Sequence, residues 1–186
     1  MNASLAAPGL HRHTVADYYR MAETGILPRD ARVELIEGTI FDRAPIGISH
    51  ASVVDRLGHL LTQATAGKAI VRVQNPVRLN TFSEPQPDLA LLRWREDFYS
   101  GAHPGPEDIL LIVEVADTSL RYDRTRKLPL YARAGIGEVW LIDLAGKCIE
   151  RHLEPGADGY TAVTTIEGHV APRGLPACEI DLAGLV

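Results

Sequence analysis

The chain has 186 residues, of which 46% are hydrophobic, a size and composition typical of one domain that builds a core without disulfides. Its formal net charge of −5 disfavours a protein that coats nucleic acid non-specifically, because such binding depends on cations that neutralise phosphates. There are two cysteines, Cys148 and Cys178, and no run of about 18 uninterrupted apolar residues. We therefore expect a soluble, cytoplasmic protein that does not insert into a membrane.

The first elements in chain order are a tail and a helix. Residues 1–13 are expected to form a flexible N-terminal tail, and residues 14–186 a single domain. Thr14 is a good N-cap with Asp17 three residues later, so a helix is predicted to begin there. Gly25 is the predicted end of that helix.

A hairpin and a second helix follow. Residues 32–41 are typical of two short strands joined at Glu37-Gly38. From about Ser49 to Ala66, apolar residues recur at the spacing of one helix face. Two further segments, 70–73 and 77–79, are strand-like.

Two apolar runs in the middle of the chain predict strands buried in the centre of a sheet. Residues 88–92 and 109–115 are apolar on both faces, and a polar loop joins them. A helix is predicted over residues 123–134, followed by a buried strand over residues 138–142. This strand–helix–strand order predicts a right-handed crossover and a parallel pair. The remaining predictions are strands at 147–150 and 160–166 and a C-terminal cap at 175–186.

Two carboxylates belong to these apolar runs. Asp88 opens the first run and Glu114 lies near the end of the second. Charged residues are rarely buried unless they are paired or bind metal, and neighbouring strands lie only about 4.8 Å apart. Two such carboxylates can hold Mg²⁺, which polarises a phosphodiester and lowers the pKa of a bound water. In the alternative interpretation, Glu114 pairs with an arginine and Asp88 caps a turn.

A basic segment follows Glu114. Asp123, Lys127 and Tyr131 are spaced i, i+4, i+8, so a helix places them on nearly one face. A lysine beside two carboxylates can orient the attacking water and offset charge in the transition state. The alternative is an ordinary surface ion pair between Asp123 and Lys127. Pro129 removes one helical hydrogen bond, so we expect a bent or late-starting helix.

Several stretches in a fixed order now resemble a known family. Pro87-Asp88 followed by Glu114 is similar to the signature of PD-(D/E)XK nucleases. The ordered set more specifically resembles the Uma-type family of restriction endonucleases, over about residues 14–182. Its stretches are Val33-Glu-Leu-Ile-Glu-Gly38, His50, Pro87-Asp-Leu-Ala-Leu91, Val113-Glu-Val115, Tyr122-Asp-Arg-Thr-Arg-Lys127, Tyr131-Ala-Arg-Ala-Gly135 and Glu138-Val-Trp-Leu-Ile-Asp143.

The resemblance implies a restriction-endonuclease-like α/β core, a mixed central β-sheet flanked by helices, with added N-terminal and C-terminal strands. Asp88 and Glu114 would be metal ligands for Mg²⁺, which Mn²⁺ can replace, and Lys127 the catalytic lysine. Glu34 matches an acidic position of the family and could complete the catalytic set, whereas Glu37 faces the other side of its strand. Glu34 could instead be an acid at the strand edge that faces solvent.

One departure from the superfamily signature concerns the lysine. Ala116 stands two residues after Glu114, where the superfamily usually has its amine, so Lys127 must reach the site from the helix. The leading interpretation is a DNA endonuclease that acts as a homodimer. The alternatives are a non-catalytic binding or regulatory module and a phosphodiesterase acting on a substrate other than duplex DNA. His50 is interpreted as a helix cap rather than a phosphate contact.

Overall fold

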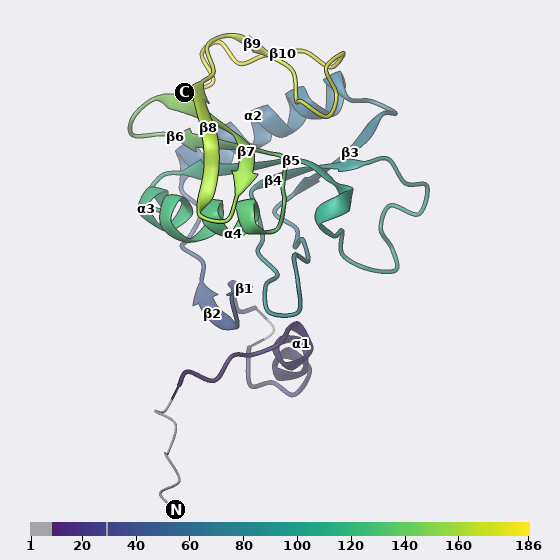
Figure 1. The fold of residues 1–186 in the computed structure, drawn as a ribbon, viewed down its shortest axis with the longest axis vertical. Coiled ribbons are helices and arrows are strands. Elements are labelled where there is room, and N and C mark those ends of the chain that lie inside the picture. The colour runs from purple at the N-terminus through teal and green to yellow at the C-terminus, as the bar shows by residue number, and fades with distance from the viewer. Residues whose placement is uncertain (1–8, 29) are drawn as a thin grey trace, which may run out of the picture.

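A computed structural model describes residues 9–28 and 30–186 and contains a six-stranded mixed sheet flanked by helices (Figure 1). The strand order is β3-β4-β5-β6-β7-β8. Strands β5 and β6 are parallel, and the other neighbours are antiparallel. The parallel pair predicted on either side of the crossover helix is therefore confirmed. The strands are β3 (Ala69–Val73), β4 (Leu89–Arg93), β5 (Ile109–Ala116), β6 (Glu138–Asp143), β7 (Cys148–Gly156) and β8 (Gly159–Thr165).

Helices cover both faces of the central strands, which explains why these strands are apolar throughout. Helix α2 (Ile48–Ala64) packs on one face against Leu91 of β4 and Val113 of β5. The crossover helix packs on the other face, against Leu92 of β4 and Ile112 of β5. Alternate residues of each strand thus enter different cores. The fold class predicted from the sequence, a mixed sheet flanked by helices, is confirmed.

The crossover helix contains a π-helical turn in its middle. It consists of α3 (Leu120–Tyr122), the π-helical turn Asp123–Lys127 and α4 (Leu128–Arg133). The amide of Leu128 donates to the carbonyl of Asp123, five residues earlier. A regular α-helix would bring the ring of Pro129 against the carbonyl four residues before it, and the wider turn relieves that clash. The irregularity predicted from Pro129 therefore takes the form of a wider turn inside a continuous helix.

The N-terminal segment carries a hairpin below the sheet. Helix α1 (Val15–Glu23) begins with the capping box predicted at Thr14 and Asp17. Strands β1 (Val33–Ile36) and β2 (Thr39–Asp42) pair through a turn in which Gly38 has φ +82°. A Cβ at Gly38 would lie 2.6 Å from the Cβ of Arg12, so only glycine fits this turn. Residues 1–8 of the expected tail lie outside the described residues, whereas Arg12 bonds the carbonyl of Glu37.

The C-terminal segment returns across helix α2. Its short strands β9 (His169–Val170) and β10 (Ile180–Asp181) pair with each other, and Arg56 of α2 donates to the carbonyl of Gly184. Buried Glu138 anchors the segment, since it accepts hydrogen bonds from the Trp140 ring, the Arg151 side chain and the Arg173 amide. The cap predicted at residues 175–186 thus packs on the domain.

One predicted strand is absent from its expected place. Residues 77–79 belong to no strand, because their amides bond to a returning loop: Val77 donates to Pro85 and Leu79 to Ser83. The loop between β4 and β5 includes a 3₁₀ turn, Pro106–Asp108. Across the residues that the structure describes, no helix is both long and apolar enough to span a bilayer.

Candidate active site

Asp88 and Glu114 lie side by side at one end of the sheet. Strands β4 and β5 are antiparallel with Leu89 opposite Val113, so Asp88, immediately before β4, lies across from Glu114. The Val115 amide donates to Asp88 Oδ2 at 2.9 Å. The two carboxylates predicted to meet on adjacent strands therefore do so. Both side chains are buried.

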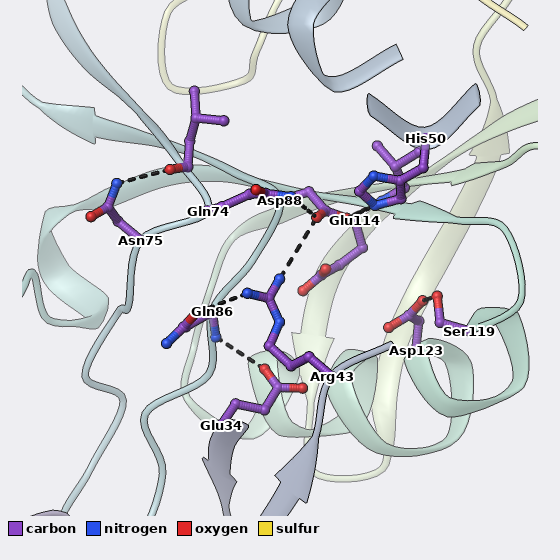
Figure 2. A network of polar contacts seen from close by, with 12 residues as sticks. Glu34, Arg43, His50, Gln74, Asn75, Gln86, Asp88, Glu114, Ser119 and Asp123 are labelled. Atoms are coloured by element: carbon purple, nitrogen blue, oxygen red, sulfur yellow. Dashed lines mark hydrogen bonds and ion pairs between the residues drawn. The ribbon is translucent and has the colours of Figure 1, made fainter. Parts of the chain in front are cut away.

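Asp88 is held by donors from three other segments (Figure 2). His50 Nε2 lies 3.1 Å from Oδ2, Gln74 Nε2 donates to Oδ1 at 3.4 Å, and Arg43 lies 3.9 Å from Oδ1. Burial raises the pKa of Asp88, but the hydrogen bond and charge of His50 and the charge of Lys127 outweigh it and lower the pKa below its ordinary value. Asp88 is therefore a carboxylate at neutral pH.

Glu114 receives the lysine and a tyrosine from the crossover helix. Lys127 Nζ lies 3.0 and 3.1 Å from the two carboxyl oxygens, and the Tyr131 hydroxyl donates to Oε1 at 2.5 Å. Burial raises the pKa of Glu114 to about 8 against the opposing effect of Lys127, with the nearby Asp123 and Asp88 raising it further. Burial by itself lowers the pKa of Lys127, but the surrounding carboxylates raise it above its ordinary value. Lys127 therefore stays protonated.

Glu34 of β1 joins the same cluster, whereas Glu37 does not. Glu34 Oε2 lies 3.4 Å from Lys127 Nζ and accepts the Gln86 amide at 3.0 Å, and Oε1 accepts the Tyr122 hydroxyl at 3.2 Å. Glu37 is 44% exposed and pairs with Arg133 on the surface. The hairpin thus contributes one acid to the site, because Glu34 lies in β1 whereas Glu37 lies in the turn that follows it.

Asp123 is a buried acid that the sequence pattern placed on one helix face with Lys127 and Tyr131, and it was not among the predicted site residues. It lies in the π-helical turn, lines the same pocket and accepts the Ser119 hydroxyl at 2.6 Å through Oδ2. Its other oxygen points toward the space beside Glu114 (Figure 2). Burial raises the pKa of Asp123, while Lys127 and Ser119 lower it less. The sequence signal for its place in the site was its position four residues before Lys127.

The interpretation of His50 as a helix cap is wrong. The N-cap of α2 is Gly47, and His50 lies inside the first turn with its ring against Asp88. The hydrogen bond to Asp88 raises the pKa of His50 against the effect of burial. Its other ring nitrogen, Nδ1, is buried and has no hydrogen-bond partner within the described part of the chain. Sequence alone could not show which strand the ring meets.

The cluster forms the floor of a pocket of about 370 Å³. The pocket lining has six acids against three cations and one histidine: Glu34, Asp42, Asp88, Glu114, Asp117 and Asp123 against Arg32, Arg43, Lys127 and His50. A buried excess of carboxylates is offset by a bound cation or by protonation. Among the described residues, no three Asp, Glu, His or Cys side chains group closely enough to ligate one ion by themselves. Mg²⁺ fits this donor set, since it commonly keeps waters beside one or two carboxylates.

Comparison with a solved structure identifies the fold of this chain, and comparison with a family model identifies its family. A crystal structure from Anabaena variabilis, titled as that of "a putative nuclease", matches with a TM-score of 0.66 and 13% identity, covering 89% of this chain and 96% of that one. The chain thus shares the mixed α/β fold of that protein. Its sequence matches the Uma2 family model, "Putative restriction endonuclease", over residues 15–183, and the chain belongs to that family. No curated protein matches it.

Proposed function

We propose that the protein is a metal-dependent endonuclease that hydrolyses phosphodiester bonds of DNA. The observation that carries this proposal is the convergence of Asp88, Glu114 and Lys127 in one pocket, with the amine 3.0 Å from Glu114. The amine comes from the helix, because position 116 is a buried alanine in the core. The family and the fold support the same class of activity.

Asp88 and Glu114 would hold Mg²⁺, with Mn²⁺ as a substitute. Both are buried, their oxygens are the hard ligands that Mg²⁺ prefers, and the pocket around them has an excess of negative charge. When bound, such an ion polarises phosphoryl oxygens and lowers the pKa of a bound water. A cation at this place would also favour the ionised form of Glu114, whose pKa burial raises.

The other residues of the site would orient these groups and bind the phosphate. Lys127 is a buried cation whose ammonium can donate to a phosphate oxygen and offset the charge that develops there. Glu34 holds Lys127 from the hairpin side, and Tyr131 fixes the carboxylate of Glu114. His50 fixes Asp88, with its Nδ1 left for a water or a substrate oxygen.

Plasmid nicking tests the proposal. Wild-type protein with Mg²⁺ or Mn²⁺ should convert supercoiled DNA to open circles, and EDTA should stop the reaction. Asp88→Asn and Lys127→Met should lower the rate at least a hundredfold, while Glu37→Gln, which changes the neighbouring surface acid, should not. Equal nicking by wild type, Asp88→Asn and Lys127→Met would disprove the assigned roles.

The competing function is a binding or regulatory module that keeps the fold without catalysis. Ala116 at the position where the superfamily usually carries lysine favours this alternative. Titration calorimetry with Mn²⁺ separates the two functions. The enzyme should bind the ion, and Asp88→Asn should abolish the signal. A module without a metal site should give no heat with either protein.

A further inference from the structure

The reactive groups lie deep in a small pocket. Asp88, Glu114, Lys127 and Glu34 are each at most 5% exposed. The residues that line the pocket around them come mainly from β2, from residues 43–47 and from the segment 117–123. The volume of about 370 Å³ is near the lower end of ligand pockets, which suits a group of nucleotide size. The phosphates of a duplex lie on its outer surface, but a pocket of this size has no room for the paired bases beside them, so a strand that has separated from its partner enters it more readily.

Two aromatic rings line this pocket and contact each other. Phe41 of β2 and Tyr122 of α3 are both half-buried, and their ring centroids are 5.5 Å apart at an interplanar angle of 55°. The Tyr122 hydroxyl is anchored to Glu34, which fixes the ring beside the proposed site. Aromatic rings next to a backbone-binding site are the platforms on which unpaired bases stack. Bases inside a duplex already stack on each other and present no free face.

Two arginines near the pocket are engaged in ion pairs, whereas two others line the pocket. Arg124 of the basic segment pairs with Glu150 at 2.5 Å, and Arg133 pairs with Glu37 at 2.8 Å. Arg32 and Arg43 instead line the pocket. With a net charge of −5, the chain lacks the overall positive charge that favours binding along duplex phosphates. The cations at the pocket can still neutralise the few phosphates that flank one cut.

We propose that the substrate is unpaired DNA, a single strand or a frayed end, whose backbone enters the pocket while one base stacks on Phe41 or Tyr122. This inference rests on the proposed nuclease function and specifies its substrate. An unpaired strand needs one site per cut. The homodimer expected from the sequence, which would place two sites on a duplex, is therefore not required.

Cleavage of matched oligonucleotides tests the proposal. The same end-labelled 30-mer is offered alone, annealed to its complement, or as a hairpin with a single-stranded tail, with Mn²⁺ under single-turnover conditions. The free strand and the tail should be cut at least tenfold faster than the duplex and the hairpin stem. Cleavage of the duplex as fast as the free strand would overturn the inference and leave the nuclease function standing.

If no substrate is cut, that result counts against the nuclease function. A DNA-binding measurement then still tests whether the protein prefers unpaired DNA. Fluorescence anisotropy with the Asp88→Asn protein in EDTA compares the free strand with the duplex. The free strand should bind at least tenfold tighter, and equal affinities would refute the preference for unpaired DNA.

Three variants test the stacking platform in the same assay. Phe41→Leu keeps an apolar side chain in its place and removes the ring, so binding of the free strand should weaken about fivefold or more. Tyr122→Phe keeps the ring for stacking but loses the hydroxyl that anchors it to Glu34, so binding should weaken less than in Phe41→Leu. Trp94→Leu is the matched control, because Trp94 is an exposed ring beyond the opposite end of β4 from Asp88. If Trp94→Leu weakens binding as much as Phe41→Leu, the pocket rings are not the platform.

Discussion

The hydrogen bond from Tyr131 to Glu114 gives the sharpest test of how the site is held. Both residues are buried, and the hydroxyl is 2.5 Å from Oε1 of the acid. Tyr131→Phe removes one oxygen and leaves the ring in its packing. At pH 9, above the pKa of about 8 of Glu114, the acceptor is a carboxylate. Hydrogen bonds to charged groups contribute about 1.5–3 kcal/mol, so the free energy of unfolding at that pH should fall by that amount. For a chain of this length the melting temperature should fall by roughly 3–12 °C.

Urea unfolding followed by circular dichroism measures this loss, with Tyr160→Phe as the matched control. Tyr160 donates to the neutral carbonyl of Ile136 at 2.8 Å, so its loss should cost only about 0.5–1.5 kcal/mol. Tyr131→Phe should also weaken Mn²⁺ binding about 10- to 100-fold, because Glu114 loses the donor that orients it. A Tyr131→Phe protein as stable as wild type, or no less stable than Tyr160→Phe, would refute the reasoning.

Three further changes probe the rest of the structure. Glu34→Gln should reduce nicking at least tenfold because Lys127 loses a carboxylate partner. Glu37→Gln should leave nicking unchanged and alter the free energy of unfolding by less than about 0.5 kcal/mol. Equal effects of the two changes would contradict the assignment of only Glu34 to the site. Asp123→Asn keeps an acceptor for the Ser119 hydroxyl but removes a buried charge. Nicking should therefore fall more than tenfold, without a loss of stability in urea. Full nicking activity would exclude Asp123 from the site. Glu138→Ala should lower the free energy of unfolding by about 2–4 kcal/mol, which is below the usual figure for a buried ion pair because Arg151 is partly exposed. Trypsin should then cut the C-terminal segment at Arg173, whose amide loses its acceptor. Unchanged digestion would show that this segment is anchored elsewhere.

Much of the fold was predictable because its signals are local. The buried strands around Asp88 and Glu114 are continuous apolar runs, and the capping box at Thr14 is formed by residues three apart. The meeting of the two acids followed from the spacing of adjacent strands once those strands were paired. The parallel pair followed from the handedness of crossovers.

The parts that could not be predicted depend on contacts between distant segments. His50 meets Asp88 only because α2 packs across the end of β4, a contact between residues 38 positions apart. Glu34 was a candidate only through the family resemblance, because it enters the site where the hairpin returns beneath the sheet, with Gln86 bonded to it from 52 positions away. No local pattern carries such information. Asp123 was misjudged for a related reason, since its burial depends on the walls of the pocket.

The π-helical turn determines which side chains of the crossover helix reach Glu34, and a deletion within the turn can show this. Residues five apart in an α-helix differ by about 140° in direction and face away from each other, whereas a π turn aligns them. Tyr122 and Lys127 are five apart, yet both contact the carboxylate of Glu34. Deleting Thr125 would shorten this turn toward ordinary helical winding without touching any acid, and would bring the ring of Pro129 against a backbone carbonyl again. The deletion would also rotate the helix residues before position 125 relative to Lys127. The one extra residue of the π-helical turn therefore determines that Tyr122 and Lys127 point in the same direction.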